Sequence, residues 1–234
     1  MFGWMKRKSF CSAVIVAAGN ASRMGGIDKI MAPLDGKPVI WHTVHAFQEN
    51  PDIHEIVVVT SGEKLVDLAQ KCKDWGFTKV TAVVCGGENR VQSVANGCSA
   101  ASKKAAYLAI HDGARPLVSQ SVISETVKKC RKFSASAPAI PVKDTVKIAR
   151  SGVVESTPER KNLMAIQTPQ VFDADLLKAA LVNASEKGLD VTDDCSCVEA
   201  MGMRVVLSKG EERNMKITTP FDLEIAELWL KKGE

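Results

Sequence analysis

The sequence has 234 residues, of which 45% are hydrophobic and 25% are charged, a balance typical of one ordinary globular domain. The formal net charge of +4 is too small and too evenly spread for a nucleic-acid-binding protein, but it suits a site that collects phosphates of a small anionic substrate. No stretch approaches the ~20 apolar residues of a membrane-spanning helix. The seven cysteines lack the spacing of a zinc site, which favours reduced thiols in a cytoplasmic protein.

Short β-branched runs alternate with amphipathic stretches from the first strand onward. The apolar run 10–18 follows three basic residues and resembles a short secretory signal, but its length favours a first buried strand. The predicted strands are 13–16, 56–59, 80–84 and 107–110, and the predicted helices are 39–49, 64–75, 91–101 and 121–133. Because such alternation places helices on both faces of a parallel sheet, the sequence predicts an α/β, doubly wound, mostly parallel fold.

The pattern changes in the second half of the chain. Residues 142–157 alternate around the turn pair Ser151-Gly152, which predicts a β-hairpin. We expect 142–165 to form a protruding β-arm whose edges are covered by a second subunit, so that the protein is a homodimer. Helices are expected at 173–187 and 193–201, a strand at 204–207, and a last helix from Thr219-Pro220 to residue 232.

The loop after the first predicted strand is suited to holding phosphates. It reads Ala17-Ala18-Gly19-Asn20-Ala21-Ser22-Arg23-Met24-Gly25-Gly26, and Lys29 follows. Small residues let backbone N–H groups turn toward an anion, although neither the dinucleotide fingerprint nor a Walker loop is present. Two cations, Arg23 and Lys29, suit attack on a nucleotide α-phosphate, where growing charge needs preorganised donors. The alternative is a tight turn with solvated cations.

Beyond this loop, the chain resembles the 2-C-methyl-D-erythritol 4-phosphate cytidylyltransferases over nearly its whole length. Six further ordered blocks carry the resemblance: Gly86-Gly87-Glu88-Asn89-Arg90-Val91-Gln92-Ser93-Val94, His111-Asp112-Gly113-Ala114-Arg115-Pro116, Pro141-Val142-Lys143-Asp144-Thr145, Gln167-Thr168-Pro169-Gln170, Thr192-Asp193-Asp194 and Asn214-Met215-Lys216-Ile217-Thr218. The resemblance implies a Rossmann-like nucleotidyltransferase domain spanning 1–234. The implied reaction joins CTP to methylerythritol 4-phosphate and releases pyrophosphate.

The resemblance also implies roles for individual residues. Arg23 and Lys29 are the expected catalytic residues. CTP is expected to contact Ala17, Ala18, Gly19, Arg23, Lys29, Gly86, Gly87, Arg90, Ser93, Asp112 and Gly113. Of these, Arg90 is expected to support the cytosine loop and Asp112 to bind Mg²⁺. The polyol phosphate is expected to contact Arg115, Thr145, Arg160 and Lys216, with Arg160 reaching the partner's site across the dimer.

Two points stay open in the sequence. Many family members carry an acid where Arg213 stands, so a second carboxylate near the metal is in doubt. Ribitol 5-phosphate cytidylyltransferases share nearly every expected CTP contact, and Ala114 only favours the isoprenoid enzyme.

A non-catalytic nucleotide-binding module is a remote alternative, because the expected catalytic and metal-binding residues are all present. His111 is interpreted as a packing residue, since this chemistry needs no general base.

Overall fold

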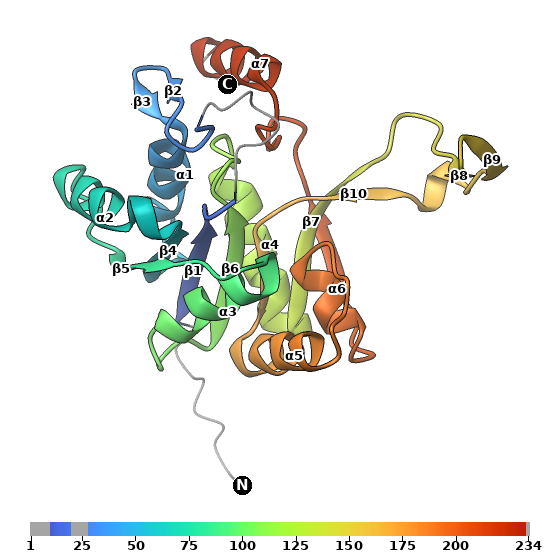
Figure 1. Cartoon of the computed structure of the whole chain (residues 1–234), viewed down its shortest axis with the longest axis horizontal. Coiled ribbons are helices and arrows are strands. Elements are labelled where there is room, and N and C mark those ends of the chain that lie inside the picture. The colour runs from blue at the N-terminus through green and yellow to red at the C-terminus, as the bar shows by residue number, and fades with distance from the viewer. Residues whose placement is uncertain (1–9, 20–27, 233–234) are drawn as a thin grey trace, which may run out of the picture.

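The computed structural model describes residues 10–19 and 28–232. An eight-stranded sheet runs through its centre, with helices on both faces (Figure 1). Seven of the strands follow the order β10-β7-β11-β6-β1-β4-β5, and β12 pairs with β7. β1, β4, β5 and β6 are parallel to one another, whereas β10 and β11 pair antiparallel with their neighbours. The predicted doubly wound, mostly parallel α/β fold is confirmed.

The first half of the chain follows the predicted alternation. Its strands are β1 (Cys11–Val16), β4 (Glu55–Thr60), β5 (Val80–Cys85) and β6 (Tyr107–Asp112). Its helices are α1 (Val39–Gln48), α2 (Leu65–Asp74), α3 (Arg90–Ala100) and α4 (Gln120–Phe133), and β2 (Pro33–Leu34) and β3 (Lys37–Pro38) form a small separate ladder. Side-chain caps fix two helix starts, because Asn89 and Ser119 accept the N–H groups of Gln92 and Val122.

The buried core lies in two layers, one on each face of the sheet. Ala13 and Ile15 of β1 pack into one layer with residues of α1 and α4, and Val14 packs into the other with residues of α3 and α5. Successive residues of a strand point to opposite faces, so a strand covered on both sides must be apolar throughout. This requirement explains why residues 13–16 of β1 and 56–59 of β4 read as uninterrupted apolar runs.

The second half of the chain departs from the sequence prediction. Three strands of the main sheet were not predicted: β7 (Ala135–Pro141), β10 (Met164–Ile166) and β11 (Gln170–Asp173). The strand predicted at 204–207 is β12 (Val206–Lys209), and the helix predicted at 193–201 is α6 (Asp194–Glu199). Helices α5 (Ala174–Glu186) and α7 (Pro220–Lys231) agree with prediction. A capping box between Thr219 and Asp222 starts α7.

A two-stranded hairpin extends away from the body of the molecule (Figure 1). β8 (Ile148–Arg150) and β9 (Val153–Ser156) pair antiparallel around the predicted turn, where Ser151 and Gly152 both have positive φ. The strands are shorter than the predicted 142–157, and the predicted arm 142–165 ends within β10, which pairs with β7 in the main sheet. None of the described helices is long and apolar enough to cross a membrane.

Candidate active site

A cavity of about 400 Å³ lies at the C-terminal ends of β1 and β6 and the start of α3, within the usual size range of ligand pockets. In open α/β sheets, ligands bind at this edge. The lining residues are Val16, Ala17, Ala18, Gly19, Lys29, Ile30, Gly87, Glu88, Asn89, Arg90, Ser93, Asp112, Ala114 and Lys216. Nine of them are residues that the sequence predicted for substrate binding.

The first loop leaves β1 along the cavity floor. The N–H of Ala17 donates to the carbonyl of Val59 at 2.7 Å, which holds the loop start against β4. Gly113 packs beneath it, since a Cβ there would come within 3.0 Å of the Ala17 Cβ. Lys29 lines the cavity at the far end of the loop. Arg23, the other predicted catalytic cation, lies outside the described residues.

The second loop joins β5 to α3 and packs tightly against the first. A Cβ on Gly86 would lie 2.5 Å from the Ala18 Cβ and 2.9 Å from the Ser93 Oγ. The N–H of Gly87 donates to Ser93 Oγ at 3.0 Å, and that hydroxyl donates to the carbonyl of Asn89 at 2.9 Å. Glycine is therefore required at position 86 for the two loops to touch, and Ser93 fixes the backbone that faces the cavity.

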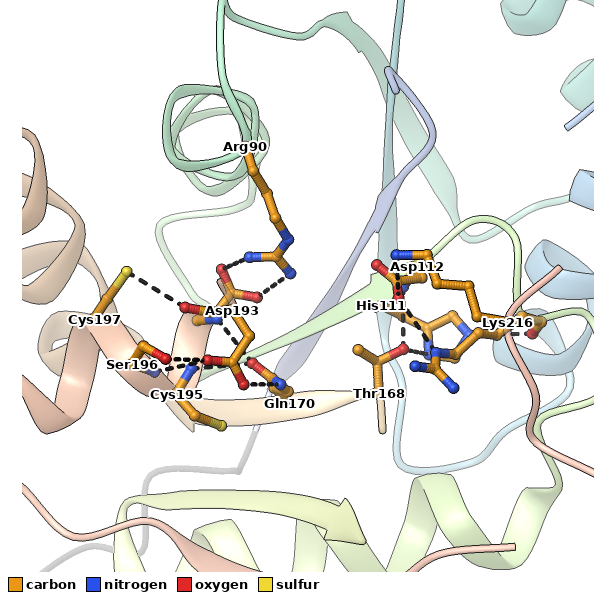
Figure 2. Close-up of polar contacts among 12 residues, drawn as sticks. Arg90, His111, Asp112, Thr168, Gln170, Asp193, Cys195, Ser196, Cys197 and Lys216 are labelled. Atoms are coloured by element: carbon orange, nitrogen blue, oxygen red, sulfur yellow. Dashed lines mark hydrogen bonds and ion pairs between the residues drawn. The ribbon is translucent and has the colours of Figure 1, made fainter. Parts of the chain in front are cut away.

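Arg90 is held by a bidentate ion pair (Figure 2). Its two terminal nitrogens lie 2.7 and 2.6 Å from the two carboxylate oxygens of Asp194, whose side chain is 1% exposed. Burial acts to lower the pKa of Arg90, but the charge and hydrogen bonds of Asp194, together with the charges of Asp112 and Asp193, outweigh it and raise that pKa, so the guanidinium stays charged. The pair ties the start of α3 to α6.

Gln170 extends this connection into the sheet (Figure 2). Its Oε1 accepts the N–H groups of Asp194 and Cys195 at 2.9 and 3.0 Å, and its Nε2 donates to Asp193 Oδ2 at 2.7 Å. Gln170 belongs to β11, so its side chain fixes α6 to the sheet. Arg90 is therefore positioned by the sheet through Asp194 and Gln170. This arrangement agrees with the expectation that Arg90 supports the loop, and it also places Arg90 in the cavity wall.

Asp112 ends β6 and accepts two cations. Arg115 Nε lies 3.2 Å and Lys216 Nζ 3.1 Å from the same oxygen, Oδ2. Burial acts to raise the pKa of Asp112, but the charges of Lys216, Arg115 and Arg90 outweigh it and hold that pKa at about 2. The carboxylate is therefore ionised at neutral pH.

His111 is fully buried behind Asp112, where its ring packs against Phe47 at a tilt of 54° with the centroids 4.8 Å apart. Its Nδ1 lies 2.9 Å from Thr168 Oγ1 and its Nε2 lies 3.3 Å from the carbonyl oxygen of Arg115. Burial lowers the pKa of His111 to about 3, so the ring is neutral. His111 is therefore buried and packed, as expected from the sequence, and both of its ring nitrogens also have polar partners.

Comparison with known proteins identifies the family. The family model of 2-C-methyl-D-erythritol 4-phosphate cytidylyltransferase matches residues 11–232. The chain belongs to this family. A relative of that name from Caldanaerobacter subterraneus is 45% identical over 224 residues, covering 94% of this chain and 99% of the relative. One from Dehalococcoides mccartyi is 44% identical over 222 residues, covering 94% and 96%.

Solved structures agree with this assignment. The structure of 4-diphosphocytidyl-2C-methyl-D-erythritol synthase from Anaerococcus prevotii matches with a TM-score of 0.85 and 30% identity, over 95% of this chain and 96% of that one. The Thermus thermophilus cytidylyltransferase matches with a TM-score of 0.77 and 29% identity, over 93% and 98%. Membership confirms the expected enzyme class, and it favours the methylerythritol phosphate family over the ribitol phosphate alternative.

Some predicted residues of this cytidylyltransferase lie beside the cavity rather than in its wall. Gly86 and Gly113 support the two loops, and Arg115 donates a hydrogen bond to Asp112. Thr145 and Arg160 lie along the arm, where Arg160 donates to the carbonyl of Lys143 at 3.0 Å and neither residue lines the cavity. Within one chain the structure therefore does not bring the arm residues together with Lys216.

Arg213, the residue that put a second carboxylate in doubt, does not line the cavity. Its Nε donates to Glu211 Oε2 at 3.0 Å, and its side chain lines a separate cavity of about 320 Å³ with Trp229. Glu211 is held in turn by the hydroxyl of Ser119 at 2.8 Å. Among the described residues, no acid lines the substrate cavity from this segment.

The donor set of the cavity fits a magnesium ion that is shared with phosphates. The described part of the chain has no group of three or more His, Cys, Asp or Glu side chains placed to hold a metal by themselves. Asp112 is ionised and 13% exposed, and the described residues leave its Oδ1 without a hydrogen bond. Magnesium commonly binds one or two carboxylates together with substrate phosphates and water. The single carboxylate of Asp112 can therefore supply the protein's ligand in such a site.

Proposed function

We propose that this chain transfers the cytidylyl group of CTP to 2-C-methyl-D-erythritol 4-phosphate and releases pyrophosphate. Family membership supports the reaction. The observation that assigns this function to a site is the cavity at the C-terminal edge of the sheet, which Lys29, Arg90, Lys216 and Asp112 line together. Such a site collects phosphates through cations and backbone N–H groups.

The reaction needs positioning and charge stabilisation more than acid or base catalysis. An oxygen of the acceptor phosphate, already ionised at pH 7, forms a bond to the α-phosphorus of CTP while the bond to the pyrophosphate oxygen breaks. Lys29 and Arg23 are proposed to stabilise the charge that grows on the α-phosphate and leaving oxygens. Lys216 and Arg115 are proposed to bind the acceptor phosphate, since their cationic groups already converge on one carboxylate oxygen.

The remaining cavity residues are proposed to bind the nucleotide. Ala17, Ala18 and Gly19 offer backbone to the triphosphate, and the loop of Gly86 and Gly87 offers close backbone contact to the cytosine ring. Asp112 would hold Mg²⁺ together with the phosphates of CTP. Bound there, the ion would neutralise phosphate charge during the transfer.

We further propose that the protein acts as a homodimer with exchanged arms. Exposed apolar side chains follow the arm, namely Val146, Ile148, Val153, Val154, Met164 and Ile166. A patch of this kind on a two-stranded edge favours association with another chain. Thr145 and Arg160 would then contribute to the partner's acceptor site. A cytoplasmic location is proposed because all seven cysteines are free and six are buried.

The function is tested by incubating the purified protein with Mg²⁺ and CTP and measuring pyrophosphate release. Release with methylerythritol 4-phosphate but not with ribitol 5-phosphate is expected. Release only with ribitol 5-phosphate would move the enzyme to the other acceptor, and release with neither would refute the transferase assignment.

The catalytic assignment is tested by Lys29→Ala, which should lower kcat by at least ~100-fold, as expected for the loss of one preorganised donor. Circular dichroism should show an unchanged fold. Lys64→Ala is a matched control, because Lys64 pairs with Asp28 near the same loop and does not line the cavity. Near-normal kcat in Lys29→Ala would remove the role assigned to it.

A further inference from the structure

A buried set of hydrogen bonds connects Asp112 to Arg115 through two side chains that do not line the cavity (Figure 2). The backbone N–H of Asp112 donates to Thr168 Oγ1 at 3.1 Å, and Thr168 Oγ1 lies 2.9 Å from His111 Nδ1. His111 Nε2 lies 3.3 Å from the carbonyl oxygen of Arg115. Thr168 is 3% exposed and His111 0%, so water does not compete for these bonds.

The partners fix the direction of each bond. The carbonyl of Arg115 can only accept, so Nε2 of His111 carries the ring proton and donates it. Nδ1 is then bare and accepts from the hydroxyl of Thr168. Since the hydrogen of that hydroxyl points to His111, its lone pairs accept the N–H of Asp112. All three bonds run one way, from Asp112 through Thr168 and His111 to Arg115.

The side chains of Asp112 and Arg115 close this set into a ring, because Arg115 Nε donates to Asp112 Oδ2 at 3.2 Å. Asn214 supports it from outside the ring. Its Nδ2 donates to the carbonyl of Thr168 at 2.8 Å, and its carbonyl accepts from Arg115 at 2.7 Å. Asp112 and Arg115 are thus each held by a hydrogen bond of the backbone and by one of the side chain.

We propose that Thr168 and His111 are positioning residues, which hold Asp112 in the orientation that binds magnesium together with CTP. This role rests on the proposed function, since it requires a metal at Asp112. Neither residue lines the cavity. Partners that orient a metal ligand typically change metal affinity or activity by about 10- to 100-fold when they are removed.

Matched variants of Thr168 test the role. Thr168→Val keeps the shape but removes the hydroxyl, which leaves the Asp112 N–H and His111 Nδ1 without partners. Titration of the protein with Mn²⁺ in the presence of CTP, followed by electron paramagnetic resonance, should show affinity weakened by about 10- to 100-fold. Thr168→Ser retains the hydroxyl and should bind Mn²⁺ like the wild type.

Phe47→Leu separates positioning from stability. Phe47 is fully buried and packs on the His111 ring without a hydrogen bond to it. The variant should lower the thermal midpoint while Mn²⁺ affinity stays at the wild-type value. His111→Phe should weaken Mn²⁺ binding as Thr168→Val does, and the double variant should be no weaker than either single one, because one chain of bonds is lost in each case.

The direction of the bonds has its own test in the wild-type protein. Long-range ¹H–¹⁵N correlation spectra of His111 should show the proton on Nε2 and a bare Nδ1, and a proton on Nδ1 would overturn the relay. Wild-type affinity for Mn²⁺ in Thr168→Val would also overturn it. Absence of Mn²⁺ binding by the wild-type protein with CTP would instead refute the proposed metal site, and the positioning role with it.

Discussion

Adding one methyl group at Gly86 should separate the two loops that form the cavity. The new Cβ would lie 2.5 Å from the Ala18 Cβ, whereas carbon atoms in contact prefer about 3.5–4.0 Å. The loops must therefore move apart by roughly 1 Å. Gly86 does not have a positive φ, so Gly86→Ala strains this contact and leaves the backbone conformation allowed.

Two quantities should change in Gly86→Ala. Overpacking of this kind typically costs about 1–3 kcal/mol of unfolding free energy, measurable by urea denaturation. Because Ala18 lines the cavity, a displacement near 1 Å should also lower kcat/KM for CTP by up to about 100-fold. Pyrophosphate release at varied CTP concentration measures the second effect.

The double variant Gly86→Ala, Ala18→Gly supplies the control. It removes the atom that the new methyl group meets, so most of the stability and of kcat/KM should return. Ser93 Oγ, at 2.9 Å from the added Cβ, is a second close contact and sets how complete the recovery is. Wild-type behaviour of Gly86→Ala, or a loss that Ala18→Gly does not relieve, would refute the contact as the reason for glycine at this position.

Three further predictions concern the buried charges and the arm. Asp194→Asn removes the partner of the buried Arg90 guanidinium and should cost about 3–5 kcal/mol of unfolding free energy in urea, whereas a double change to Arg90→Met and Asp194→Leu should restore stability. His111 has a folded pKa of about 3 against 6.5 unfolded, so its contribution to stability is complete above pH 6.5 and falls by about 1.4 kcal/mol per pH unit below it. Denaturation of His111→Phe should lack this part of the pH slope. Arg160→Ala should raise the KM for the acceptor, and mixing it with Lys29→Ala should restore activity if exchanging subunits share sites.

The sequence predicted the strands whose burial on both faces of the sheet produces a simple pattern of residue types. β1 and β4 are covered on both faces, and their segments 13–16 and 56–59 read as continuous apolar runs, so their positions could be predicted from residue type alone. β7 could not, because Ala-Ser-Ala-Pro-Ala-Ile-Pro is poor in β-branched residues and contains two prolines. It becomes a strand through its neighbours β11, β10 and β12, which come later in the chain. Such pairing is a tertiary effect.

The candidate site divides in the same way. Loops that follow parallel strands converge at one edge of the sheet, so the cavity residues near Gly19 and Asp112 were predictable from their place in the chain. The partners of these residues were not. Arg90 and Asp194 are 104 positions apart, and Thr168 and His111 are 57 apart. Asp194 and Thr168 stood in conserved-looking blocks of the resemblance, but the sequence offered no sign of which cation or ring each would meet.

The charges of the cavity explain why those partners matter for function. Arg90 is balanced by Asp194, and Lys216 is balanced by Asp112. The pair of Arg90 and Asp194 is bidentate, and the Asp194 side chain is nearly fully buried. Breaking this pair would therefore leave a buried charge with neither water nor a partner. Lys216 is 39% exposed, and among the described residues it makes one ion pair, at 3.1 Å, so it can exchange a carboxylate for a phosphate at small cost. The structure therefore separates a fixed cation, which holds the start of α3, from an exchangeable one. Under the proposed function, exchange at Lys216 would release carboxylate charge on Asp112 for the metal.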